Sequence, residues 1–504
     1  MKRTLCVVAL LTLIALLSVP VSAHEGHNDS SEIGVVDGIS YDENLNSVSE
    51  PYTKPEIERL VARSAARVEK IRNRNFRSVP EVTIQQREDF QGFNGTSSDP
   101  EQTRWNNIVW ESSFIVGNDS NVNEEIRTLT ASGALGYYEP STGKIVLLTD
   151  SSTDTVREIP GSTLVHELTH ALQDQYYDIS QQKYVGQTQD EQLSVDGMLE
   201  GEAIYVTSQY EQKCNSNWSC VSGSSSPGSG ITDINFGVYI TVIFPYSNGE
   251  NYVEELYQSD GWSRVDTALR DPPNKTATII NRDISENYSS ETKERLYIPR
   301  TQLEGWGRFS TDYGYQGGDS LGQATVSTMF WYQNRTYGAD TVPPIAIRQT
   351  RQGVQFNYSV RYADGLVNDR VVPYKSGSQN GYVWRTDWEN EAEADEFLSG
   401  YRAIIEAHDG KAKNRTWHIQ SGPYDGWFNV TKSGTTVYVS HGPSKKVADG
   451  LLSVSSNEEN PIDPPKNLPK DGPSLPSISM QQSISIIVVL GLIAIIAVPI
   501  VRDR

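Results

Sequence analysis

The fold is organised around the stretch Thr163-Leu164-Val165-His166-Glu167-Leu168-Thr169-His170-Ala171-Leu172-Gln173-Asp174-Gln175. Its apolar residues recur at helical spacing, which predicts a helix from about residue 161 to about 177. His166 and His170 lie four positions apart, so both imidazoles lie on one helix face and can bind one Zn²⁺. Glu167 lies between them and can act as a base toward a water molecule. An amphipathic helix with incidental histidines is the alternative.

A third zinc ligand is required, because two imidazoles do not complete the usual protein ligand set of a catalytic zinc ion. The candidates lie on a second predicted helix over 192–206, where Glu200 and Glu202 are two positions apart. Side chains at that spacing do not share a helix face, so only one of the two can reach the metal. On the first helix, Asp174 follows His170 by four positions and can accept the second ring N–H of that imidazole. A solvated position is the alternative for Asp174.

His166-Glu167-Leu168-Thr169-His170 followed by Leu199-Glu200-Gly201-Glu202-Ala203 resembles the gluzincin group of zinc metallopeptidases. The resemblance implies a zincin-like core in which His166, His170 and Glu200 bind Zn²⁺ and Glu202 lies behind them. It also implies hydrolysis of peptide bonds, in which Glu167 takes a proton from the attacking water and passes it to the leaving amine. Tyr246, in Phe244-Pro245-Tyr246, is a candidate hydrogen-bond donor to the tetrahedral oxyanion.

Much of the chain also resembles a set of uncharacterised haloarchaeal surface proteins, through motifs such as Asp271-Pro272-Pro273 and Trp384-Arg385-Thr386-Asp387-Trp388. The net charge of −21 is spread along the chain. That distribution argues against nucleic-acid binding and indicates a strongly hydrated acidic surface. Such a surface suits high external salt, where repulsion between carboxylates is screened. We therefore expect a halophilic source, with an ordinary acidic secreted protein as the alternative.

Both ends of the chain carry export and anchoring signals. A basic start, an apolar run and a small-residue site at Val21-Ser22-Ala23 predict a signal peptide over 1–23. The uncharged apolar run within 483–501 predicts a single transmembrane helix, preceded by a Pro/Ser-rich stalk over 451–482. The basic tail at 502–504 would remain in the cytoplasm. The bulk of the chain is then expected at the cell surface, on the outside.

Two further features agree with an extracellular location. Once the signal peptide is removed, Cys214 and Cys220 are the only cysteines that remain, and their closeness predicts one disulfide bond. Ten Asn-X-Ser/Thr sequons are spread along the chain, as in a glycoprotein.

The order of the remaining signals predicts an α+β fold. We expect an N-terminal α+β segment over 24–130, the zincin-like core with its mixed sheet over 131–300, and a C-terminal α+β lobe over 301–450. Helical spacing of apolar residues predicts an amphipathic helix over 391–407 within that lobe. Two strands over 135–148, joined by Pro140-Ser141-Thr142-Gly143, immediately precede the zinc helix. In the peptidases that this motif resembles, such a strand pairs with an extended substrate; a hairpin that only packs the helix is the alternative.

The predicted function is that of a membrane-anchored extracellular zinc metallopeptidase acting on a peptide or protein substrate. The expected partners are that substrate, the membrane through the C-terminal helix, and proteins of the cell envelope. A glycosylated surface or adhesion protein that keeps a zincin-like fold without turnover is the alternative. Metal content and peptide cleavage with and without a chelator distinguish the two.

Overall fold

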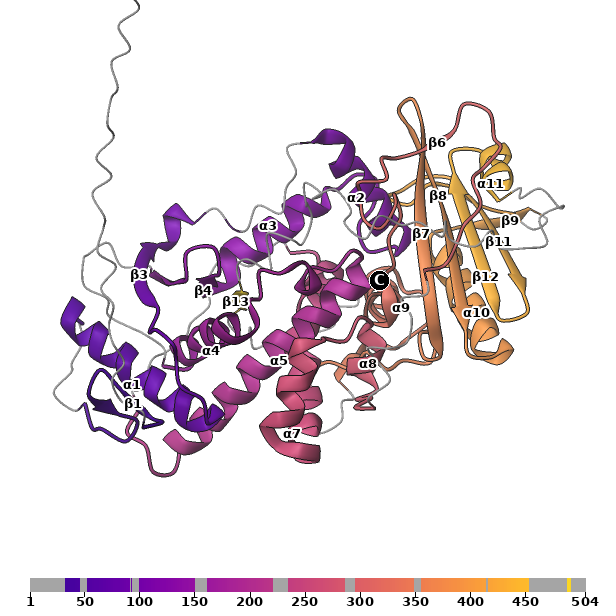
Figure 1. The fold of residues 1–504 in the computed structure, drawn as a ribbon. Helices are drawn as coiled ribbons and strands as arrows, with labels where there is room; N and C mark the ends of the chain where they lie inside the picture. Colours follow the sequence, from indigo (N-terminus) through magenta and orange to yellow (C-terminus); the bar gives the residue numbers. More distant parts are fainter. Residues whose placement is uncertain are drawn as a thin grey trace, which may run out of the picture.

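The fold was examined in a computed structural model, which describes residues 32–45, 52–90, 92, 99–149, 161–220, 234–285, 295–348, 355–413, 416–452 and 487–490. Helices and strands are mixed along the chain, so the α+β prediction is confirmed (Figure 1). The predicted signal peptide, almost all of the stalk and the cytoplasmic tail lie outside the described residues. In chain order the elements are β1 (Val35–Val36), β2 (Ile39–Ser40), α1 (Lys54–Arg72), β3 (Glu81–Gln86), η1 (Arg87–Asp89), α2 (Pro100–Ser112), α3 (Val122–Gly133), β4 (Ala134–Glu139), β5 (Lys144–Thr149), α4 (Gly161–Tyr177), η2 (Gln182–Tyr184), α5 (Gln189–Cys214), α6 (Phe236–Val242), α7 (Phe244–Arg270), α8 (Thr276–Ile280), β6 (Gly307–Arg308), α9 (Gly322–Tyr337), η3 (Pro344–Arg348), β7 (Leu366–Ser376), β8 (Gln379–Trp388), α10 (Glu391–Ala407), β9 (Lys411–Lys413), β10 (Thr416–Ile419), β11 (Gly426–Ser433), β12 (Thr436–Gly442), α11 (Lys445–Leu451) and β13 (Ile487–Leu490).

A small mixed sheet of order β13-β4-β5-β3 lies beside helix α4. The predicted hairpin forms: β4 and β5 pair antiparallel from Glu139 opposite Lys144 to Gly136 opposite Leu147. Strand β3 pairs parallel with β5. The Tyr138 hydroxyl of β4 donates a hydrogen bond to Asp174 of α4, with 2.8 Å between the oxygens. The sheet and the helix that carries the two histidines are therefore tied together directly.

Strand β13 differs from the transmembrane helix predicted at 483–501. Of that span the structure describes only Ile487–Leu490, which pairs antiparallel with the outer edge of β4. For these four residues the helix prediction is wrong. Apolar runs rich in Ile and Val favour strands as well, and their periodicity does not separate the two states. Among the described residues, no helix combines the length and the apolar character needed to cross a bilayer.

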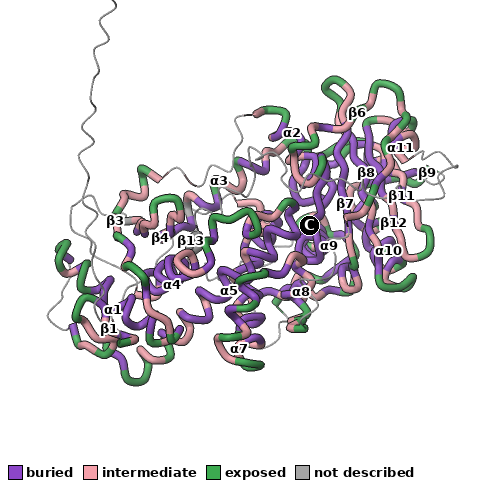
Figure 2. Tube along the Cα trace, viewed as in Figure 1, coloured by how far each residue is buried: buried purple, intermediate pink, exposed green. Residues whose placement is uncertain are grey.

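Helix α5 forms the centre of the helical region and is buried along most of its length, in contact with α1, α4 and α7 (Figure 2). Helices α5 and α7 cross closely at Gly201 and Gly249. A Cβ atom added to Gly201 would lie 2.4 Å from the Gly249 carbonyl, and one added to Gly249 would lie 2.2 Å from the Gly197 oxygen. Only glycine fits such an approach of two backbones. The crossing brings the first turn of α7 against the Glu200 turn of α5.

The C-terminal region is a seven-stranded antiparallel sheet of order β6-β7-β8-β12-β11-β10-β9, covered by helices on both faces. Side chains alternate between the faces, as a strand requires. On β8, Trp384 meets Phe397 of α10 edge to face, with 5.4 Å between ring centroids. Its neighbour Val383 instead belongs to the apolar cluster under α11. The helix predicted over 391–407 is confirmed as α10.

Buried carboxyl groups join this sheet to the helical region. Asp190, at the start of α5, accepts hydrogen bonds from the backbone and the hydroxyl of Thr276. Asp369 of β7 accepts from the backbone of Leu321 and Gly322, at the start of α9. Burial raises the pKa of Asp190 to about 7 and that of Asp369 to about 6.

We expect Asp190→Asn to remove part of the pH dependence of stability. Because the folded pKa of Asp190 is raised, its contribution is present near pH 4 and is lost as the pH rises to about 7. The loss is at most about 4 kcal/mol. An asparagine keeps the accepting oxygen and does not titrate. Relative to the wild type, the Tm of the variant at pH 7 should therefore rise compared with its Tm at pH 4. If the difference in Tm between the two pH values is the same in both proteins, the raised pKa of Asp190 is contradicted.

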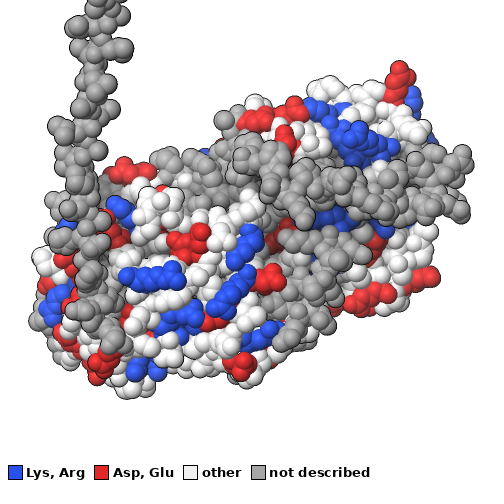
Figure 3. All heavy atoms as spheres, in the orientation of Figure 1, with Lys and Arg blue, Asp and Glu red and all other residues white. Residues whose placement is uncertain are grey.

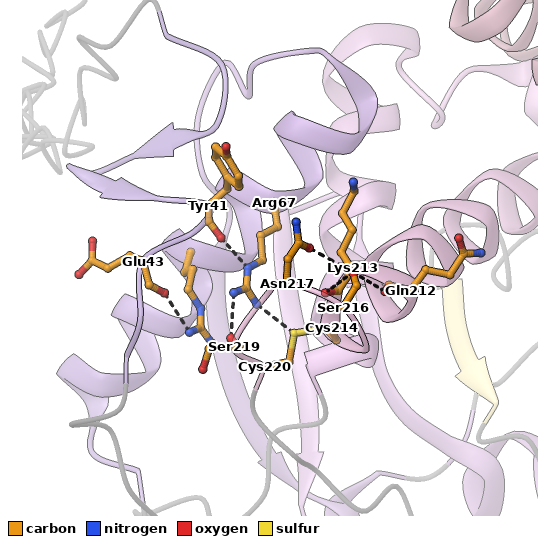
Figure 4. Close-up of a disulfide and its surroundings, with 11 residues drawn as sticks. Tyr41, Glu43, Arg67, Gln212, Lys213, Cys214, Ser216, Asn217, Ser219 and Cys220 are labelled. Carbon is orange, nitrogen blue, oxygen red and sulfur yellow. Dashed lines mark hydrogen bonds between the residues drawn. A yellow bond between two sulfur atoms is a disulfide. The ribbon is translucent and has the colours of Figure 1, made fainter.

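The predicted disulfide is confirmed between Cys214 and Cys220, just after α5 (Figure 4). Arg67 of α1 inserts into the loop that the disulfide closes. The guanidinium donates hydrogen bonds to the carbonyls of Tyr41 and Ser219, and its centre lies 4.9 Å from the centroid of the Trp218 ring. The N-terminal segment, α1 and the end of α5 thus meet at one buried cation.

Acidic side chains are scattered over the face shown in Figure 3, interspersed with Lys, Arg and uncharged residues. No single acidic patch stands out on the part of this face that the structure describes.

Candidate metal centre

Three side chains from two helices converge on one buried point. His166 and His170 project from α4, and Glu200 projects from α5. Glu200 Oε2 lies 3.0 Å from His166 Nε2 and 3.5 Å from His170 Nε2. The three donor atoms all lie within 4.8 Å of one another. The structure therefore brings together the three residues predicted as ligands, and selects Glu200 over Glu202 for this position.

The donor set fits a tetrahedral zinc ion. Bonds of about 2.0–2.1 Å at tetrahedral angles place neighbouring ligand atoms about 3.3 Å apart. The two distances measured to Glu200 lie on either side of that value. In addition, His170 Nε2 is buried and has no hydrogen-bond partner among the described residues. Leaving such a group unsatisfied costs about 1–3 kcal/mol, which a bound cation would remove.

Electrostatics give His166 and Glu200 suitable protonation states. Burial lowers the pKa of His166, so its ring is neutral at neutral pH. Burial alone would raise the pKa of Glu200, but the two adjacent imidazoles lower it to about 2. Neutral imidazole and ionised carboxylate are the forms that bind a divalent cation.

Tyr246 contacts Glu200, and Glu167 lies close enough to Tyr246 to affect it electrostatically. Glu167 is 0% exposed on α4, and its charge contributes to the environment of Tyr246. The Tyr246 hydroxyl donates a hydrogen bond of 2.8 Å to Glu200 Oε1. Burial, together with the charge of Glu200, raises the pKa of Tyr246 well above its usual value, so the hydroxyl keeps its proton. Its contact orients the carboxylate; the predicted donation to an oxyanion stays a prediction.

Asp174 does not take the position predicted for it. Its carboxylate accepts from Tyr138 and from the backbone of Ile179. The partner of His170 Nδ1 is instead Gln173 Oε1, at 2.8 Å. Residues three and four positions along a helix both lie near the starting side chain, and here the amide at the third position reaches the ring.

Glu202 lies behind Gln173 and is tied to a buried cation. Gln173 Nε2 donates hydrogen bonds of 2.8 Å to the Leu199 carbonyl and to Glu202 Oε2. The other oxygen of Glu202 forms an ion pair with Arg72 of α1. Arg72 also pairs with Asp266 of α7 at 2.8 Å. These residues connect the histidine of α4 to three other helices, α5, α1 and α7.

Gln173, Arg72 and Asp196 are the residues that the sequence interpretation missed. Helical spacing could have found Gln173, but no sequence signal links Arg72 to a glutamate on α5. Asp196 lies one turn before Glu200 and accepts a hydrogen bond from Gln192. Burial, with a smaller effect of Glu200, raises its pKa to about 8. The protonated form of Asp196 is therefore favoured more than that of an ordinary aspartic acid.

Comparison with known proteins gives one partial match. A family model described as a domain of unknown function (DUF8575) matches residues 310–452. That range covers α9 and the sheet from β7 to β12, and excludes the three candidate metal ligands. No curated protein and no solved structure matches the chain significantly.

Proposed function

We propose that this chain is a zinc metallopeptidase of the gluzincin type. The observation that carries the proposal is the buried convergence of His166, His170 and Glu200, with Glu167 on the same helix as the two histidines. A buried cluster of two imidazoles and one carboxylate is the donor chemistry that catalytic zinc prefers.

The residues of the chain divide the work of peptide hydrolysis. When bound, zinc would supply a Lewis acid that polarises the scissile carbonyl and activates water. Glu167 takes the proton from the attacking water and delivers it to the leaving amine. Tyr246 holds Glu200 Oε1, which leaves Oε2 directed at the two histidines.

The edge of β4 is the proposed place for an extended peptide. It is the outer edge of the β4–β5 hairpin, and α4 packs against it. In the structure β13 pairs with this edge, so an extended peptide would bind β4 in place of Ile487–Leu490. Main-chain hydrogen bonds would give affinity there, and side-chain pockets would give selectivity.

We also propose that the protein acts outside the cell. The support is the leader-like start and the Cys214–Cys220 disulfide, which favours an oxidising compartment.

The proposal is tested by metal content and turnover of the purified protein. We expect about one zinc per chain and cleavage of a peptide library in high salt, lost with a chelator and restored by zinc. Zinc without cleavage would favour a non-catalytic surface protein. Absence of zinc after incubation with excess metal would reject the proposal.

A further inference from the structure

A chain of buried polar contacts begins at His170 and ends at a cation on another helix. His170 Nδ1 lies 2.8 Å from Gln173 Oε1, and Gln173 Nε2 lies 2.8 Å from Glu202 Oε2. Glu202 then pairs with Arg72, and Arg72 pairs with Asp266. The side chains of Arg72 and Glu202 are each only 1% exposed. The contacts cross four helices, α4, α5, α1 and α7.

The direction of the hydrogen bonds fixes the tautomer of His170. Glu202 is a carboxylate paired with Arg72, so it accepts, and the side facing it must be the Gln173 NH₂ group. The Gln173 oxygen then faces His170 and accepts from Nδ1–H. A neutral ring protonated at Nδ1 carries its lone pair at Nε2, and this nitrogen faces Glu200.

The cation at the end of the chain forms a buried ion pair with Glu202. Burial alone would disfavour both charges, but Arg72 has two carboxylates, those of Glu202 and Asp266, within ion-pair distance. The Arg72 guanidinium also lies 4.0 Å from the centroid of the Trp262 ring, which adds a cation–π contact. The orientation of the Gln173 amide is therefore set by Glu202 and Arg72, which are not candidate metal ligands.

We infer that Gln173 and Glu202, anchored by Arg72, are positioning residues that hold His170 in its metal-binding tautomer. The inference rests on the proposed metal function. It assigns to an amide the task that a carboxylate or a carbonyl usually performs beside a ligating histidine. A neutral amide fixes the ring without adding a negative charge to the ion.

The test is a reciprocal exchange of the two groups in the full chain. In Glu202→Gln, a second amide faces Gln173. When the NH₂ group of the new glutamine points to Gln173, the Gln173 amide turns and presents its own NH₂ to His170. This orientation favours the tautomer of His170 that is protonated at Nε2, which cannot bind the metal through that nitrogen. In Gln173→Glu, two carboxylates meet. In the double variant, the carboxylate now at position 173 accepts from His170, and the amide now at position 202 donates to that carboxylate. The order of donors and acceptors between His170 and position 202 is restored, while the Leu199 carbonyl loses its donor. Gln175→Glu makes the same change two positions along the helix, outside the chain of contacts.

The readouts are zinc affinity by competition with a chelating dye and the visible absorption of bound Co²⁺. Each single variant should bind zinc about 10–100-fold more weakly, with an altered Co²⁺ spectrum. The double variant should recover part of the affinity that the single variants lose and shift the Co²⁺ spectrum back toward that of the wild type, and Gln175→Glu should match the wild type. A merely structural role would not give recovery by exchange.

Three outcomes would overturn the inference. Wild-type zinc affinity in both single variants would show that the contacts do not act on His170. Losses that add in the double variant would show that the two residues act separately. In either case, zinc binding by the wild type would leave the proposed function standing. No binding of zinc or Co²⁺ by the wild type would overturn both.

Discussion

Glu167→Gln is expected to lower peptide hydrolysis by about 10²–10⁴-fold while zinc remains bound. Glu167 lies between the two histidine ligands and is fully buried on α4. Glutamine preserves its size but cannot take up the proton of the attacking water. The two histidines and Glu200 are unchanged, so the zinc content should stay at the wild-type value. Initial rates and metal content, measured on the same preparation, give both quantities.

Asp174→Asn is the matched control on the same helix. The Asp174 carboxylate accepts hydrogen bonds from Tyr138 and from the Ile179 backbone, and the partner of the His170 ring is Gln173. The variant should therefore keep its zinc and most of its activity, although its Tm can fall. Wild-type turnover by Glu167→Gln would remove the proposed base. A zinc loss in Asp174→Asn equal to that of a ligand variant would restore the role that the sequence suggested for this residue.

His166→Ala is expected to abolish both stoichiometric zinc and hydrolysis. The change removes one of three donors, and the two that remain do not form a usual zinc site. The side chain is buried, so a cavity would also lower Tm. Metal analysis after dialysis and the rate with added zinc separate loss of metal from loss of fold.

His418→Ala serves as the control for removal of a histidine. His418 lies on β10, where it stacks on Trp427 at 4.2 Å between ring centroids, in the C-terminal sheet. Its removal should leave zinc content and turnover at wild-type values. Full zinc occupancy in His166→Ala would contradict the ligand assignment.

Local patterns predicted much of the fold. Helical spacing gave the helix from 391 to 407 with the bounds of α10, and turn residues gave the β4–β5 hairpin. The six-residue separation of Cys214 and Cys220 was sufficient for the disulfide. His166 and His170 lie on one helix, so their proximity follows from helix geometry alone.

Features that depend on tertiary packing were not predicted. Gln173, and not Asp174, contacts His170 because of where β4 and α5 lie. Tyr138 of β4 donates a hydrogen bond to Asp174, and Glu202 of α5 accepts one from Gln173. Arg72 reaches Glu202 across 130 residues of sequence, and no local pattern encodes that pair. The order of the seven-stranded sheet likewise depends on pairing between distant strands.

The most direct measurement is anomalous diffraction, at energies above and below the zinc edge, from crystals of the protein grown with zinc. We expect one strong peak present only above the edge, about 2.0–2.2 Å from His166 Nε2, His170 Nε2 and one Glu200 oxygen. A map without a peak at this point, or with the Glu200 carboxylate turned out of coordination distance and no other acid in its place, would contradict the account.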